Sequence, residues 1–259
     1  MIGNGLYLGN ENYRDSNVFM SQSAAASGNP VTAGRILEVN NTAASYPGTG
    51  TVWYDVSSNG YDINTINSPT WTTADGWALN GTTQFLSGST ALSNGLNSAW
   101  NSSAAVRNGI TIFVDCYKNA NGSEGSLFAG WIDSPLALKV LFEINSNQTV
   151  ETAVNQTTSG VTGANTTGTI TTAARSIMAM VIPSDGVKTI YRNNSALSGT
   201  QSVPANNWVA DAPFYRFGAR GTIDAPSSYF AGKIKAIVAY NRALDSTELT
   251  SVYNYLNAL

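Results

Sequence analysis

The last thirty residues of the chain constrain its fold more than any other segment. The even-numbered residues from Phe230 to Tyr240 alternate with a set that includes Lys233 and Lys235, and this period of two predicts a β-strand with one face in the core. The period changes at Asp245, a favourable N-cap residue, and Glu248 can complete a capping box. Apolar residues then recur at helical spacing, at Leu249, Val252, Tyr253 and Leu256. The segment therefore predicts a long strand followed by a short amphipathic helix.

Short alternating segments separated by turn residues fill the chain from Thr51 onward. We predict strands at residues 51–55, 77–79, 83–87, 110–117, 126–131, 136–144, 148–154, 175–182, 187–192, 214–218 and 230–240. We expect no helix before the closing one, and we predict an exposed loop or a polar hairpin at the low-complexity stretch 155–172. This pattern indicates an all-β fold, an antiparallel β-sandwich with a short C-terminal α-helix.

Four segments resemble the laminin-G-like, or concanavalin-A-like, lectin/glucanase family. Three of them read S-Y-P-G-T-G-T-V-W-Y-D-V-S-S-N-G at 45–60, W-A-L-N-G-T-T-Q-F at 77–85 and I-Y-R-N-N at 190–194. The fourth is the closing segment at 230–256, in which the predicted strand is followed by the corner N-R-A-L and the predicted helix. Ser58 and Asn194 stand where the family usually has glycine. The resemblance implies one jelly-roll sandwich over residues 45–259, with residues 1–44 outside it as an N-terminal arm or docking segment. The alternative is that residues 1–44 add strands to the sandwich.

The composition restricts the partners. Charged residues make up 11% of the chain and the net charge is −3, whereas a nucleic-acid groove needs clustered cations, so we expect no nucleic-acid partner. The chain contains no run of eighteen apolar residues, so we expect no membrane insertion. Cys116, the only cysteine, shares its parity with the apolar residues of the predicted strand 110–117, which predicts a buried, inert thiol.

The residues that catalysis would need are missing from the sequence pattern. The chain has no histidine, which removes histidine-based triads and the usual general base at neutral pH. The glucanases of the resembled family carry a Glu-x-Asp-x-x-Glu strand, and no such segment occurs here. Glu143 and Glu151 stand alone on their predicted strands. We therefore predict a protein that is not an enzyme and keep a glycoside hydrolase of the same fold as the less favoured alternative.

Asp55, Ser57 and Asn59 place oxygen-bearing side chains at alternate positions after the first sandwich strand. Such a set could hold a structural calcium ion. The same residue types also close turns on their own backbone. We favour the turn, and expect no cofactor beyond this possible calcium.

Sugar sites combine exposed aromatic faces with amides and carboxylates. The sequence offers two such groups, Trp208 with Asn207 and Asp211, and Trp131 with Asp133. The alternative is that these tryptophans are buried anchors of their loops.

Three residues of the resembled motifs are expected to have structural roles. We expect Trp53 in the core, and Arg242 and Glu248 as a structural pair in the closing motif rather than a binding site.

The stretch from Ser45 to Asp55, preceded by a polar arm, resembles laminin-G-like virion proteins of tailed bacteriophages. The resemblance implies a virion structural protein, as a head decoration, fibre or tail-associated protein. Its partners would be other virion proteins, copies of itself and cell-surface polysaccharide. No signal peptide is visible after Met1, which fits a virion protein made in the host cytoplasm. The alternative is a free carbohydrate-binding lectin module.

Overall fold

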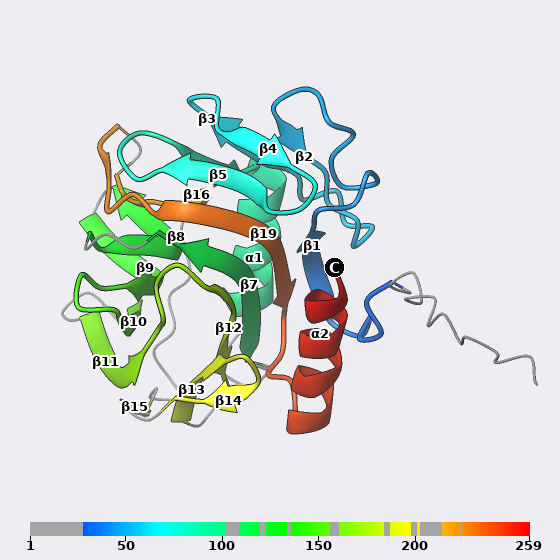
Figure 1. Ribbon diagram of the computed structural model, residues 1–259. Helices are drawn as coiled ribbons and strands as arrows, with labels where there is room; N and C mark the ends of the chain where they lie inside the picture. Colours follow the sequence, from blue (N-terminus) through cyan, green and yellow to red (C-terminus); the bar gives the residue numbers. More distant parts are fainter. Residues whose placement is uncertain are drawn as a thin grey trace, which may run out of the picture.

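The computed structural model describes residues 28–101, 109–119, 123–133, 136–155, 161–183, 187–197, 201–202, 214–222 and 224–259. Within them, two large antiparallel sheets stack as a sandwich, and a C-terminal helix covers one outer face (Figure 1). The predicted all-β fold with a closing helix is confirmed. In this described part of the chain, no helix has the length and apolar character needed to cross a lipid bilayer.

The first sheet is built around one long strand. Its strands are β1 (Arg35–Val39), β4 (Thr70–Thr72), β5 (Gly76–Asn80), β7 (Ile110–Lys118), β12 (Arg175–Ile182), β13 (Val187–Arg192), β14 (Ser195–Ala196), β15 (Gln201–Ser202) and β19 (Ala231–Tyr240). The order is β14-β13-β12-β7-β19-β5-β4, with β15 beside β13. β19 pairs with β7 along one side, and along the other with β5 and then β1. β19, near the C-terminal end of the sequence, therefore pairs with β1 and β5 from its first third.

The second sheet contains the middle of the chain. Its strands are β2 (Val52–Trp53), β3 (Ile63–Ile66), β6 (Phe85–Gly88), β8 (Gly125–Asp133), β9 (Leu136–Ile144), β10 (Thr149–Asn155), β11 (Val161–Thr169) and β16 (Phe214–Phe217). They run in the order β11-β10-β9-β8-β16-β6-β3-β2. A separate ribbon of β17 (Arg220–Gly221) and β18 (Pro226–Ser227) contacts β8. Every predicted strand overlaps an observed one.

The first sheet is buried on both faces. Along β7, Ile112, Val114 and Cys116 face the second sheet, and Phe113 faces the closing helix. The chain therefore has two cores, one between the sheets and one under the helix. Cys116 is buried, as predicted, and burial raises the pKa of its thiol.

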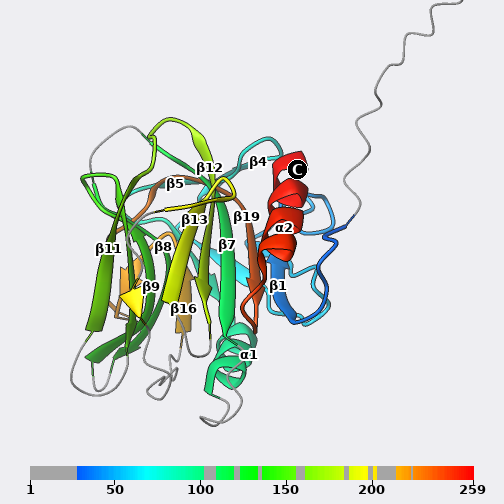
Figure 2. The same cartoon turned by 90° about the horizontal axis from the view of Figure 1, so that it is seen from below.

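The closing helix α2 (Ser246–Ala258) begins as the sequence predicts (Figure 2). The Asp245 side chain accepts hydrogen bonds from the second and third helical N–H groups, and the Glu248 carboxylate accepts one from the Asp245 backbone N–H, which completes the capping box. The helix packs on the first sheet through buried side chains at Leu249, Val252, Tyr255 and Leu256. Tyr253 is only partly buried.

The single buried face predicted for β19 is wrong for half of the strand. Ile234 lies in the core between the sheets, but Val238 and Tyr240, of the same parity, lie under α2, and Ile237 takes the inner position. The cause is a bulge between Ile234 and Ala236, where the pairing register with β7 shifts. An extra residue in one strand reverses the side-chain parity beyond it.

Two other elements differ from the expectations. The expectation of no early helix is wrong, because Thr90–Asn101 forms α1, whose Leu92 and Leu96 are buried one turn apart. Ser89 acts as its N-cap, since its Oγ accepts from the Leu92 N–H. The low-complexity stretch adopts the hairpin alternative, with β11 antiparallel to β10.

The boundary drawn at residue 45 does not coincide with the edge of the sandwich. β1 precedes that boundary and pairs with β19, with Leu37 and Val39 fully buried. The boundary followed the family resemblance, which begins later than the first strand of the sheet. Residues 1–27 lie outside the described residues.

Replacing Leu256 by alanine should weaken the attachment of α2. Leu256 is fully buried between the helix and the first sheet, and truncating a buried leucine costs about 2–5 kcal/mol. Urea unfolding measures the loss, with Asn254→Ala on the exposed side of the same helix as the control. An unchanged unfolding free energy for Leu256→Ala would contradict this packing.

Candidate functional site

The structure describes only two of the five predicted sugar-binding residues, Trp131 and Asp133. Asn207, Trp208 and Asp211 lie outside the described residues. Trp131 and Asp133 belong to β8, where Trp131 is the register partner of Phe214 in β16. A role of these residues in sugar binding therefore stays a prediction.

The Asp55 turn is closed by its own backbone. One Asp55 carboxylate oxygen accepts from the N–H groups of Glu38 and Ser57 at 2.9 and 2.8 Å, and the other accepts from the Tyr61 N–H and the Ser57 hydroxyl at 3.0 and 2.8 Å. Asn59 donates to two carbonyls of β1. Four donors fill the lone pairs of the carboxylate, so a cation would have to displace them. Among the described residues, no group of three His, Cys, Asp or Glu side chains suits a metal ion.

The other motif residues lie in structural positions. Trp53 is fully buried, and its indole N–H donates to the Asn40 carbonyl at 2.8 Å. Arg242 forms two hydrogen bonds of 2.6 Å with the Glu248 carboxylate and holds the first turn of α2 to the end of β19. These contacts account for the motif without a ligand.

A groove of about 810 Å³ opens between β1, the loop that follows it and the end of α2. Its lining includes the exposed residues Thr32, Thr42 and Thr73, and the Thr42 hydroxyl donates to the Asn40 amide oxygen at 2.6 Å. Small apolar side chains, including Ala43 and Ala44, lie between them. Sequence reasoning missed this groove because it assigned its residues before position 45 to the arm. The three apolar residues Ile36, Leu37 and Val39 were the only local signal that could have placed them on a strand.

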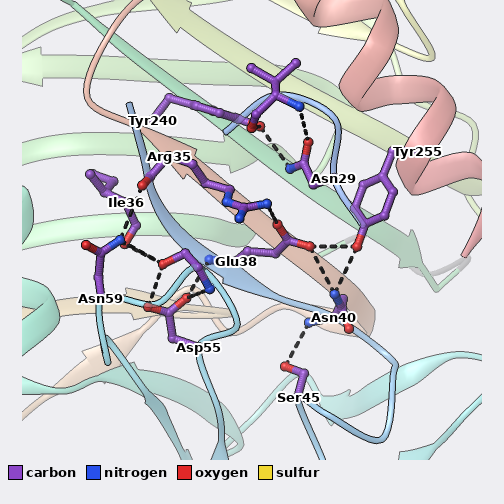
Figure 3. Close-up of polar contacts among 12 residues, drawn as sticks. Asn29, Arg35, Ile36, Glu38, Asn40, Ser45, Asp55, Asn59, Tyr240 and Tyr255 are labelled. Atoms are coloured by element: carbon purple, nitrogen blue, oxygen red, sulfur yellow. Dashed lines mark hydrogen bonds and ion pairs between the residues drawn. The ribbon is translucent and has the colours of Figure 1, made fainter. Parts of the chain in front are cut away.

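A buried polar network forms the floor of this groove (Figure 3). Glu38 is 2% exposed, and one of its carboxylate oxygens accepts from the Tyr255 hydroxyl at 2.6 Å and from the Asn40 amide at 3.2 Å. The other oxygen pairs with the Arg35 guanidinium at 2.6 Å. Burial, reinforced by the neighbouring Glu38 carboxylate, raises the pKa of Tyr255, so its hydroxyl keeps the proton that it donates. The network ties β1 to α2.

Two buried atoms of residues that line the groove have no partner among the described residues. Asn41 is 8% exposed and donates its amide to the carbonyls of Thr73 and Leu259, but its Oδ1 accepts nothing. The Nε of Arg35 likewise donates to no described atom. Each unpaired buried polar atom costs about 1–3 kcal/mol.

Two carboxylates that the sequence analysis left unpaired occupy facing positions in the second sheet. Glu143 of β9 and Glu151 of β10 are register partners and share a face. Directly opposed residues of antiparallel strands have Cβ atoms about 4.5–5.5 Å apart. The signal was the turn between Ile144 and Val150, which are also partners and fix the register of the hairpin.

Glu143 is enclosed at this position. Its side chain is 1% exposed, and the Arg220 guanidinium lies 3.1 Å from one oxygen and 3.2 Å from Glu124. The other Glu143 oxygen has no partner in the described part of the chain. Burial raises the pKa of Glu143 to about 7 against the opposing charge of Arg220, and the charges of Glu124 and Glu151 add to the rise.

Residues 97–250 match a laminin-G family model described as the Concanavalin A-like lectin/glucanases superfamily. The match covers more than half of the 259 residues. The chain belongs to this superfamily. The sandwich and its lectin-like character follow from this membership, and the resemblance to the family is confirmed. No curated protein matches the chain.

Solved structures share this concanavalin A-like fold. A Trypanosoma rangeli sialidase in complex with sialic acid matches with a TM-score of 0.63 and 17% identity over 88% of this chain and 33% of the sialidase. The binding domain of botulinum neurotoxin DC in complex with rat synaptotagmin II matches with a TM-score of 0.65 and 12% identity over 87% of this chain and 52% of that one. The same domain in complex with SialylT gives a TM-score of 0.63. This chain thus spans about a third to a half of these proteins, and the likeness shows the fold.

Replacing Glu143 by glutamine should change how stability depends on pH. The pKa of Glu143 is about 7 in the folded protein against an ordinary 4.5, so the folded state holds the proton more tightly. Its contribution to the unfolding free energy therefore falls as pH rises from about 4.5 to 7, by roughly 3 kcal/mol in total. The advantage of the glutamine variant over the parent should grow over that range and then level off.

Urea unfolding between pH 4.5 and 8 measures this difference. Asp224→Asn removes an exposed carboxylate and serves as the control for the loss of a charge. A difference between Glu143→Gln and the parent that stays constant with pH would contradict the assignment.

Proposed function

We propose that this protein is a structural component of a bacteriophage virion that displays a non-catalytic, glycan-binding sandwich. Membership of the concanavalin A-like superfamily supports the glycan-binding part. The enclosure of Glu143 carries the choice of binding over hydrolysis. The place in the virion would be a head decoration, a fibre or a tail-associated position, as the resemblance implies.

Hydrolysis is the second candidate because Glu143 and Glu151 oppose each other. Retaining glycosidases place two carboxyl groups about 5–5.5 Å apart, one as nucleophile and one as acid. A raised pKa, as in Glu143, is what the acid needs. The acid must also reach the glycosidic oxygen, and Glu143 is 1% exposed behind Arg220. This arrangement favours binding.

The sugar would bind at the two predicted sugar-binding tryptophans, Trp208 and Trp131. Aromatic faces cover the apolar faces of sugar rings while amides and carboxylates bond the hydroxyls, which fits Trp208 with Asn207 and Asp211 and Trp131 with Asp133. The sialidase and the neurotoxin domain were solved with sialic acid and SialylT, so sialylated glycans belong among the probes. The expected partners are cell-surface polysaccharide, other virion proteins and further copies of this chain.

Replacing Trp208 by alanine should remove glycan binding without unfolding the protein. Loss of one stacking aromatic should weaken binding at least tenfold. A glycan array followed by calorimetry on the strongest glycan measures the change. Tyr54→Ala, at an aromatic residue that is 44% exposed, is the matched control. Hydrolysis of the bound glycan that Glu151→Gln abolishes would contradict the non-catalytic assignment.

A chain beginning at Gly28 should stay folded and lose its place in the virion. We place the docking role in residues 1–27 of the predicted arm 1–44, and this truncation keeps β1 in its sheet. The lost part contains the apolar anchors that could contact another virion protein, Leu6, Tyr7, Leu8, Tyr13, Val18 and Phe19. Ordering such an arm costs about 1–2 kcal/mol per residue, which a partner surface must offset.

Copurification with particles and the melting temperature together test this docking role. A chain beginning at residue 45 is the comparison, because it also removes β1 and should melt at a lower temperature. Particles that still incorporate the chain from Gly28 would contradict the docking role.

A further inference from the structure

We propose that the edge strand β11 pairs with the β11 of a second copy of this chain and joins the two copies through their second sheets. This pairing rests on the proposed function in one respect, the expectation that further copies of this chain are partners, and it names the surface of that contact. Purified protein tests the pairing, so its outcome is distinct from the outcomes for virion incorporation and glycan binding.

The other described edges of the two large sheets are protected. Natural sheets shorten their edge strands, place charges on them or cover them, because an open edge can pair with another chain. β2, β14 and β15 have two residues each, and β4 has three. β1 is longer, but it carries Arg35 and Glu38, and the Glu38 backbone bonds to the loop that contains Asp55. These edges offer little for another chain to pair with.

β11 is the long edge strand of the second sheet. It has nine residues and ends the strand order beside β10, with no described strand on its other side (Figure 1). A shift in register interrupts its pairing with β10 beyond Asn165, so the regular ladder runs over Val161–Asn165. This stretch is therefore the part of β11 that can take up a further strand in regular geometry.

The composition of this stretch leaves it open to pairing. It reads V-T-G-A-N and holds no charged residue and no proline. In an antiparallel ladder, alternate residues of an edge strand direct their backbone N–H and C=O groups away from the neighbouring strand. Charges and proline are what usually prevent such groups from pairing with another chain, and neither is present here.

A second copy of the chain is the partner that suits this edge. Antiparallel pairing about a two-fold axis brings the same stretch against itself, so one sequence supplies both halves of the contact. Pairing all of Val161–Asn165 puts the axis at Gly163, with Val161 opposite Asn165 of the second copy. The chain carries a net charge of −3, but this uncharged stretch sets no like charges opposite each other across the axis.

Sedimentation equilibrium of the full chain, at about 10 µM to 1 mM, measures the association. The contact is small, because one short stretch from each copy forms it, so we expect a dimer with a dissociation constant of about 10 µM or weaker. A parent protein that stays monomeric up to about 1 mM would overturn the proposal. That result would also be found if the edge instead takes up a segment of another protein.

Two double variants that differ at one position separate pairing from folding. Val161→Lys/Asn165→Lys sets like charges opposite each other across the axis and should weaken association at least fivefold. Val161→Lys/Asn165→Glu sets a lysine opposite a glutamate and should associate more tightly than the first variant. Within one chain the order is reversed, because position 165 is the register partner of Glu151, where a lysine favours folding and a glutamate opposes it.

Thr70→Lys/Thr72→Lys is the matched control. It adds the same charges at the exposed residues of β4, an edge strand of the first sheet, and should leave association unchanged. Equal association of the two β11 variants, or an equal loss in the β4 variant and in Val161→Lys/Asn165→Lys, would overturn the pairing.

Discussion

The bulge in β19 is the constraint on which the three-layer arrangement depends. Before it, Ile234 fills the core between the sheets, and after it Ile237 continues that core while Val238 and Tyr240 turn to the other side. One extra residue thus gives β19 two apolar faces in its second half. The outer face would be exposed without α2, so the shift in parity requires a covering helix. β1 pairs with this same half of β19 and is placed beside the helix.

The two ends of α2 are held by ion-paired arginines as well as by packing. At its start, Arg242 holds Glu248, and at its end Arg175 donates to the Leu256 carbonyl while pairing with the buried Asp115 of β7. A cation near the last carbonyls also suits the negative end of the helix dipole. With both ends fixed, Tyr255 is held over Glu38, and the groove obtains its floor. The site is therefore a consequence of how the helix is anchored.

The sequence predicts the fold well where burial follows a simple period. The strands with regular apolar alternation and the capping box of α2 are found because one local pattern specifies each of them. β1 and α1 are missed because each offers only a few apolar residues in a polar context, and their burial depends on partners far along the chain, such as β19 and β16. The groove joins segments near residues 40, 73 and 255, so no local pattern contains it. The facing acids were within reach, since the turn between them fixes their register.

The two buried glutamates differ in how far their charge is compensated. Glu38 has a cation and two neutral donors, so its charge is fully compensated and its role is to join β1 to α2. Glu143 has one guanidinium and an unpaired oxygen, the environment of an acid that holds its proton. Arg220 of the β17–β18 ribbon pairs with it, and Arg220 is itself held by Glu124. Because Arg220 lies in the short β17–β18 ribbon and not in the two large sheets, a substitution there would change the charge around Glu143.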